Sequence, residues 1–347
     1  MSVRDFAKPI SWTVADLRTV WIAVLGAILV AIMVAAASIG AVHIPMGAFL
    51  SGNFEPQHFA VLSSIRLPRV LLAAVVGGAL ALAGAAMQGL FRNPLADPGL
   101  IGISSGAMLA VAAVIVLAGN LGGVIGLYGL SIAAFVGALC ASAIIFKLAR
   151  LSGTVSVTYL LLAGIAVNAM GAAGTGFLAY LSDDTQLRTI TFWSMGSVGG
   201  ALWPGVLVAA TIILPAATIL IHNAQRLNIQ LLGEENAHCL GIDTERLKLT
   251  VVICTSLTVG AAVAVSGIIA FIGLVVPHLV RLMFGADHRI LLPASALLGA
   301  ILLVLADTVA RTLLAPAEMP VGIITSLIGS PFFLWLLARQ YSGRFAI

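Results

Sequence analysis

The chain is built from long runs of apolar residues, and these runs constrain its fold more than any other feature. A helix needs about 20 apolar residues to cross a membrane, so 347 residues allow roughly ten such helices with short loops. Hydrophobic residues make up 61% of the chain and charged residues only 9%, whereas a soluble domain carries about 25% charge. We therefore predict an all-α multi-pass membrane protein. Its spans are expected near residues 19–42, 69–91, 99–118, 127–149, 157–181, 203–222, 248–265, 267–284, 290–310 and 319–338.

The sequence predicts one membrane domain. Residues 1–18 are polar and are expected to form a cytoplasmic tail, and residues 19–347 form a single transmembrane domain. The first apolar run is too long for a secretory signal peptide and follows this polar stretch, so we expect no such peptide. Small residues at 77–79 and 171–174 predict faces on which helix backbones pack closely in lipid.

The basic residues predict the orientation of the chain, because cytoplasmic loops carry an excess of Lys and Arg. With the predicted spans and both termini in the cytoplasm, all but four of the 17 basic residues fall on the inner side. The four on the outer side are Arg66, Arg69, Arg188 and Arg311. The net charge of +4 is thus explained by membrane topology, and we expect no nucleic-acid partner.

One long polar segment, His222–Lys248, interrupts the apolar runs on the predicted cytoplasmic side. Apolar residues recur in it at the spacing of one helix face: Leu231, Leu232, Ala237 and Leu240. Gly233 and Gly241 are typical of turns, and Asp243 can cap the next span. The segment therefore predicts short amphipathic helices at the membrane surface. They suit the docking of a soluble partner, although an ordinary solvated connection would also fit.

The sequence has no motif that would make this chain an enzyme. A phosphate-binding P-loop requires a lysine directly after a glycine, and none of the three lysines (Lys8, Lys147 and Lys248) has that neighbour. The three cysteines (Cys140, Cys239 and Cys254) lack metal-ligand spacing. We therefore expect no catalytic residue, no bound metal and no cofactor.

Several motifs in order along the chain carry a resemblance to a known family. They are Arg66-Leu67-Pro68-Arg69, residues 83–99 (AGAAMQGLFRNPLADPG), 160–164 (LLLAG), 232–241 (LGEENAHCLG), 271–278 (FIGLVVPH), 287–289 (DHR), 292–293 (LP), 306–307 (AD) and 320–322 (PVG). The chain resembles the permease subunits of bacterial ABC importers for iron chelates, haem and cobalamin, the FecCD-like family. The resemblance covers the whole chain apart from the N-terminal tail.

The resemblance implies a type II ABC importer permease fold of ten helices in the bacterial inner membrane. It also implies a homodimer around a central pathway, two ATPase subunits on the cytoplasmic side and a periplasmic substrate-binding protein on the other. ATP hydrolysis would belong to the separate ATPase, so this subunit would only form the pathway.

Three groups of residues match functional positions of the family. The cytoplasmic loop 223–247 would couple to the ATPase through Gly233, Glu234, Ala237, Leu240 and Gly241. The binding protein would dock on Arg66, Arg69 and Arg311, and lipid headgroups are the alternative partners of these arginines. The cytoplasmic gate would be formed by Asn93, Leu95, Ser156 and Val157, although residues 93–95 also fit a plain tight turn.

The substrate is predicted from one short stretch. Residues 190–203 (ITFWSMGSVGGALW) resemble the haem branch of the family more than the cobalamin branch, so we expect haem, with a ferric siderophore and cobalamin as alternatives. The fifth span is expected to supply pathway-lining residues, including Asn168, Met170 and Tyr180. A secondary carrier that needs no ATPase is the competing class, and it would leave the 222–248 segment dispensable. Buried acids, which ion-coupled carriers use at mid-membrane, are scarce here.

Overall fold

The computed structural model describes residues 14–40, 44–52, 54–118, 123–150 and 155–342, and the regular elements in these ranges are all helices. Seven of them are long and apolar enough to cross a membrane. They are α1 (Val14–Ser38), the continuous helix of α3 (Pro56–Val61), η1 (Leu62–Arg66) and α4 (Leu67–Phe91), then α6 (Gly123–Ala149), α7 (Val157–Leu181), α9 (Trp203–His222), α12 (Thr244–Ser266) and α14 (His288–Thr312).

Three further apolar helices fall on the remaining predicted spans: α5 (Ile103–Leu117), α13 (Ile272–Phe284) and α15 (Val321–Ser342). The prediction of an all-α multi-pass membrane protein is therefore confirmed. Short helices occupy the connections. They are α2 (Met46–Ser51), η2 (Pro98–Ile101), α8 (Asp184–Ser194), α10 (Ala224–Gln230) and α11 (Glu234–Cys239).

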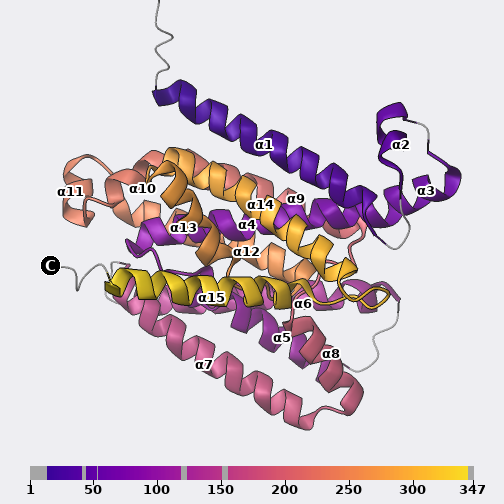
Figure 1. Ribbon diagram of the computed structural model, residues 1–347. Coiled ribbons are helices and arrows are strands. Elements are labelled where there is room, and N and C mark those ends of the chain that lie inside the picture. The colour runs from indigo at the N-terminus through magenta and orange to yellow at the C-terminus, as the bar shows by residue number, and fades with distance from the viewer. Residues whose placement is uncertain (1–13, 41–43, 53, 119–122, 151–154, 343–347) are drawn as a thin grey trace, which may run out of the picture.

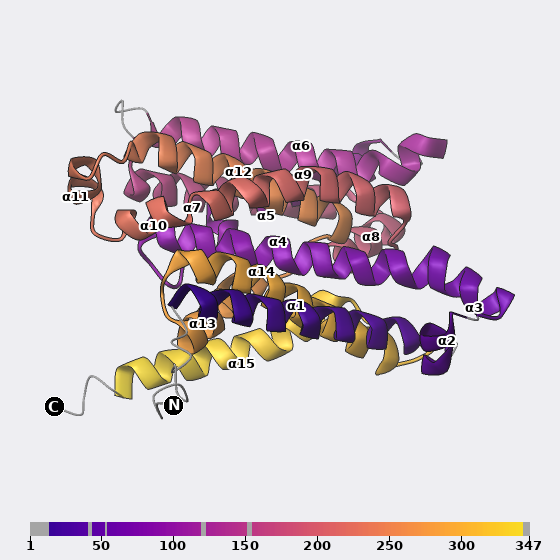
Figure 2. The ribbon, with the colours of Figure 1, turned by 90° about the horizontal axis from the view of Figure 1, so that it is seen from above.

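The long helices run side by side, with α4, α12 and α14 inside the bundle and α1 and α7 on opposite outer faces (Figures 1 and 2). In the most apolar stretch of the helix that contains α4, 78% of residues are buried, against 17% in α7. Small residues permit this close packing. A Cβ on Gly77 would lie 2.3 Å from the carbonyl oxygen of Gly299, and one on Gly84 would lie 1.9 Å from that of Gly273.

One predicted span begins differently in the structure. Residues 267–271 are not helical, so α13 starts at Ile272 rather than at 267. Gly267 and Phe271 both have a φ of +67°, which is incompatible with a continuous helix. At Gly267 a Cβ would also lie 2.3 Å from the carbonyl oxygen of Trp193, so this bend packs against the end of α8. The helix α8 itself was not predicted, although Asp183 and Gln186 form a capping box at its start.

The bundle has two distinct ends. The first turn of α1, the last turn of α15, α10 and α11 lie at one end, which we call the α11 end (Figures 1 and 2). Helices α2, α3 and α8 lie at the opposite end, which we call the α8 end. The candidate functional residues divide between these two ends.

Candidate functional site

The polar segment 223–247 forms the short helices that the sequence predicts. Helices α10 and α11 are joined by a turn at Gly233, where φ is +104°, and α11 ends in a turn at Gly241, where φ is +81°. Both backbone conformations favour glycine. The Asp243 carboxylate accepts a hydrogen bond from the Arg246 amide at 3.0 Å and caps α12, as expected. We call residues 223–247 the coupling loop, after the function that the family resemblance predicts for it; that function stays a prediction.

The coupling loop divides its apolar residues between the chain and the surroundings. Ala237 is fully buried within the chain, so it packs internally instead of offering its side chain to a partner. Leu232 and Leu240 are about 60% exposed (59% and 60%). Helix α10 is fixed to α14, since the Asn228 side chain donates to Asp287 at 2.7 Å and accepts from the His288 amide at 2.9 Å. An exposed apolar patch on a fixed base is suited to contact another protein.

A buried lysine connects the coupling loop to two other elements. Lys248, 2% exposed, lies in the first turns of α12. Its ammonium donates to Glu234 Oε2 at 2.8 Å, to Glu245 Oε1 at 3.0 Å and to the Val155 carbonyl oxygen at 2.7 Å. The other oxygen of Glu245 accepts from the Val155 amide at 2.9 Å. We call these four residues the Lys248 cluster.

The candidate gate residues form two separate groups. Asn93 and Leu95 lie in a tight turn after α4, in which the Asn93 side chain accepts from the Leu95 amide at 3.0 Å. Ser156 caps α7 by accepting from the Tyr159 amide at 3.5 Å, and Val157 is the first residue of that helix. Leu95, but neither Ser156 nor Val157, lines a cavity of about 360 Å³.

The cavity beside Leu95 lies against the bend that precedes α13. Its walls include Phe271 and Leu274, and Asp97 supplies a carboxylate. Burial raises the pKa of the Asp97 carboxyl, and the hydrogen bond from the Gly99 amide at 2.7 Å opposes that rise. The bend at residues 267–271, which sequence reasoning missed, therefore lines the same space as one candidate gate residue.

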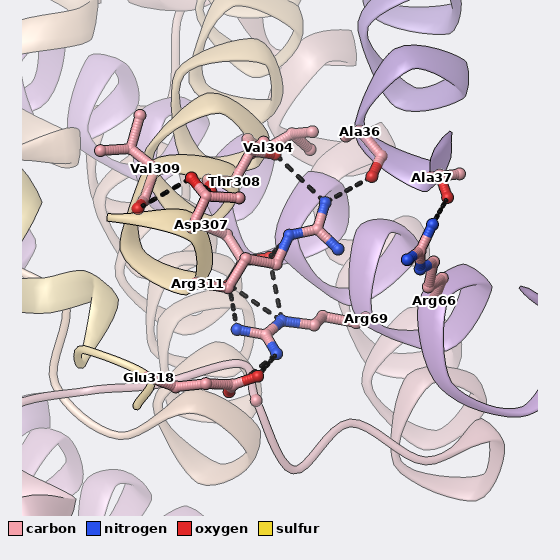
Figure 3. Close-up of polar contacts among 12 residues, drawn as sticks. Ala36, Ala37, Arg66, Arg69, Val304, Asp307, Thr308, Val309, Arg311 and Glu318 are labelled. Carbon is pink, nitrogen blue, oxygen red and sulfur yellow. Dashed lines mark hydrogen bonds and ion pairs between the residues drawn. The ribbon is translucent and has the colours of Figure 1, made fainter. Parts of the chain in front are cut away.

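The three candidate docking arginines lie at the α8 end, but their side chains are buried. Figure 3 shows their polar contacts. Arg69 holds two acids from distant parts of the chain. Its Nε and Nη2 donate to Asp307 of α14 at 2.9–3.0 Å, and its Nη1 donates to both oxygens of Glu318 at 2.9 Å. Arg69 thus joins α4 to α14 and to the connection before α15.

The other two arginines bind the end of α1. Arg66 donates to the carbonyl oxygens of Ala37 and Ser38 at 2.7 and 2.8 Å. Arg311 donates to the carbonyl oxygen of Ala36, and its Nε lies 3.9 Å from Asp307 Oδ2. Carbonyl oxygens at the end of a helix are natural acceptors for such cations. The docking function of the three arginines stays a prediction, whereas their contacts within the chain are structural.

The three pathway residues expected on α7 differ in their exposure. Asn168 does not face outward from α7, because its side chain accepts from Ser105 Oγ at 2.6 Å and donates to the Gly99 carbonyl oxygen at 3.2 Å. Met170 and Tyr180, in contrast, are 73% and 85% exposed. Among the described residues, no group of His, Cys, Asp and Glu is arranged to hold a metal ion.

Comparison with known proteins identifies the family of this chain. The model of the FecCD transport family matches residues 27–339. The hemin transport system permease protein HmuU of Yersinia pestis is 52% identical over 317 residues, which cover 91% of this chain and 95% of that protein. The cobalamin import system permease protein BtuC of Halobacterium salinarum is 44% identical over 277 residues, 80% of this chain and 73% of its own length.

A solved structure supports the same relationship. It is an inward-facing conformation of a transporter assigned to the metal-chelate type of ABC transporters, with a TM-score of 0.83 and 34% identity over 92% of this chain and 99% of the other. The extent of these matches and the apolar helical bundle lead to one conclusion: this chain belongs to the FecCD transport family and is a multi-pass permease of the ABC importer type.

Proposed function

We propose that this chain is the permease subunit of an ATP-driven importer that carries haem into the bacterial cytoplasm. The observation that carries the proposal is the 52% identity to a hemin permease over 91% of the chain. Identity to the cobalamin permease is 44% over 80% of the chain, which makes cobalamin the second candidate. The exposed face of α7 carries apolar side chains such as Met170 and Phe177, which suit a flat, largely apolar substrate.

The coupling loop supports a requirement for a separate ATPase. Leu232 and Leu240 expose apolar side chains on a loop that is held to α14 and α12, so force applied there reaches the spanning helices. A secondary carrier would have no use for such a surface. We therefore propose that the α11 end faces the cytoplasm, that both chain termini are cytoplasmic, and that an ATPase subunit binds each permease copy at this end.

The remaining partners follow from the family. We propose a homodimer with the pathway between the copies, as the family resemblance implies. Helices α7 and α15 expose large apolar residues in the single chain, among them Ile165, Leu327 and Trp335, which fit either a second copy or lipid. We propose docking of the periplasmic binding protein at the α8 end, near Arg66, Arg69 and Arg311. Because Arg69 is held by Glu318 within the chain, a carboxylate from the partner would compete with Glu318 for this guanidinium.

Uptake by proteoliposomes tests the proposed function. The whole complex, with the permease, its ATPase and a cognate binding protein, is offered haem, a ferric siderophore and cobalamin in turn. We expect ATP-dependent uptake of haem. Uptake of cobalamin or the siderophore instead would contradict the substrate, and uptake without any ATPase would contradict the importer mechanism.

A further inference from the structure

Within the part of the chain that the structure describes, the Lys248 cluster is the one place where the coupling loop and a candidate gate segment are held by the same side chain. Every donor hydrogen of the Lys248 ammonium has an acceptor in the cluster. An ammonium has three donor hydrogens, and the Lys248 nitrogen lies within 3.0 Å of three oxygens. A buried cation persists only when it is paired and hydrogen-bonded. The position of Lys248 is therefore fixed by Glu234, Glu245 and Val155 together.

The three acceptors lie at the ends of three different helices. Glu234 is the first residue of α11, in the coupling loop, and Glu245 lies in the first turn of α12. Val155 immediately precedes Ser156, the cap of α7. Both backbone groups of Val155 are held, the amide by Glu245 and the carbonyl by Lys248. The start of α7 thus follows any displacement of this cluster.

The contact between Glu234 and Lys248 is the one in this cluster that can break when α11 moves. Among the described residues of α11, it is the one whose side chain has a hydrogen bond to a spanning helix. Its side chain is 40% exposed, so water can replace Lys248 when the contact breaks. The contact between Lys248 and Val155 is buried. A movement of α11 can therefore pull on Lys248 or release it, while Lys248 keeps its hold on Val155.

We propose that Lys248 is a positioning residue that links the coupling helix α11 to the gate end of α7, through Glu234 on one side and Val155 on the other. The proposal rests on the proposed ATP-driven import. In it, Glu234 acts within the chain instead of contacting the ATPase, which is a different function from the one that the sequence predicts for this residue.

The most direct test removes the link at Glu234 and leaves the rest of the cluster in place. Glu234→Ala takes away one acceptor, whereas Lys248 retains Glu245 and Val155. Glu235→Ala is the matched control, because Glu235 is an exposed neighbour on the same helix. We expect Glu234→Ala to copurify with the ATPase like the wild type and to hydrolyse ATP within about twofold of it. Substrate uptake per ATP hydrolysed is expected to fall about tenfold, and Glu235→Ala is expected to match the wild type.

A second readout follows the gate without depending on the substrate. Val157→Cys is placed in a background with Cys140→Ser and Cys239→Ser, because those two thiols are exposed. In the complex, we expect ATP with vanadate to change the rate at which a maleimide labels residue 157. Adding Glu234→Ala is expected to abolish that change, and adding Glu235→Ala is expected to preserve it.

The outcomes separate this proposal from the proposed function. Loss of ATPase copurification in Glu234→Ala would place Glu234 at the interface and overturn the link. A wild-type labelling response in Glu234→Ala would overturn it as well. If the wild-type complex shows the nucleotide-dependent labelling change but does not import haem, the haem assignment fails and the link is still decided by the labelling comparison.

Discussion

At each end of this permease a buried cation binds two carboxylates, and the two arrangements differ. At the α8 end, Arg69 binds Asp307 and Glu318, and the side chain of Asp307 is 3% exposed. At the α11 end, Lys248 binds Glu234 and Glu245, whose side chains are 40% and 39% exposed. Water therefore reaches both acids of the Lys248 cluster and Glu318, which is 52% exposed, but not Asp307. The two clusters differ in that only the Arg69 cluster holds a fully buried ion pair.

The two cations also differ in the geometry of their hydrogen-bond donors. A guanidinium presents its donors in a rigid planar fork that matches carboxylates, whereas an ammonium is a compact charge with rotatable donors on a flexible stem. Arg69 uses its fork to hold α4, α14 and the connection before α15 in one arrangement (Figure 3). Lys248 can keep one acceptor while it exchanges another. The comparison indicates a fixed joint at the α8 end and a movable one at the α11 end.

The largest expected effect comes from breaking the fixed joint. Arg69→Leu would leave Asp307 buried without its main partner, which costs about 3 to 5 kcal/mol of unfolding free energy. Arg311 compensates in part at most, because its Nε is 3.9 Å from Asp307 Oδ2, which is an ion pair but beyond hydrogen-bond distance. Thermal unfolding in detergent, followed by tryptophan fluorescence, measures the loss. Arg69→Leu with Asp307→Leu removes both charges and is expected to recover part of it, because it also takes away the carboxylate beside buried Arg311. An unchanged unfolding temperature in the single variant would show that the α8 end is not a fixed joint.

Much of the fold was predictable because span length and apolar content are local properties of a sequence. The turns at Gly233 and Gly241 and the helix cap at Asp243 were equally predictable, because each depends on its immediate neighbours in the sequence. The bend at 267–271 was not predictable in this way. The apolar run continues through it, and its close approach to the Trp193 carbonyl is a tertiary contact.

The two charged clusters were missed for a related reason. Glu318 lies 249 residues from Arg69, so no spacing pattern connects them. Glu234 and Lys248 are only 14 residues apart, but a turn and the start of a new helix separate them. The sequence does contain one indication of the Lys248 cluster. Lys248 directly precedes an apolar run, and an ionisable residue in a membrane span usually has a charged or polar partner.

The second prediction concerns the exposed surface of the movable end. Leu240→Asp would place a charge on the exposed patch of the coupling loop, where removal of an interface anchor commonly costs about 2 kcal/mol or more. We expect ATPase binding to weaken by that amount and the unfolding temperature to stay at the wild-type value, because Leu240 is 60% exposed. Titration of the ATPase onto immobilised permease measures the affinity. Equal weakening by Cys239→Asp, an exposed neighbour, would mean that Leu240 is not a specific anchor.

The third prediction compares how much Lys248 and Arg69 each contribute to the unfolding free energy of the protein. Lys248→Met keeps the length of the side chain and removes its charge. We expect a loss of about 1 to 2 kcal/mol in unfolding free energy, less than for Arg69→Leu, because water can reach Glu234 and Glu245. Arg246→Met, on the same helix with an exposed side chain, is expected to unfold like the wild type. A loss as large as that of Arg69→Leu would mean that both ends are equally fixed.

The smallest expected effect tests whether the fixed joint also serves the binding protein. Glu318→Gln keeps an oxygen that can accept from Arg69 but removes the negative charge, and since the side chain of Glu318 is 52% exposed, the stability change is expected to stay below about 1 kcal/mol. If a carboxylate of the binding protein approaches Arg69, loss of the competing charge strengthens docking by up to about 1 kcal/mol. The gain is expected to shrink at high salt, because exposed charges are screened over about 10 Å at 0.1 M. Glu55→Gln is the control, since Glu55 is an exposed acid in the chain just before α3. Weaker docking in Glu318→Gln would make Glu318 the contact residue, and Arg69 would then act only within the chain.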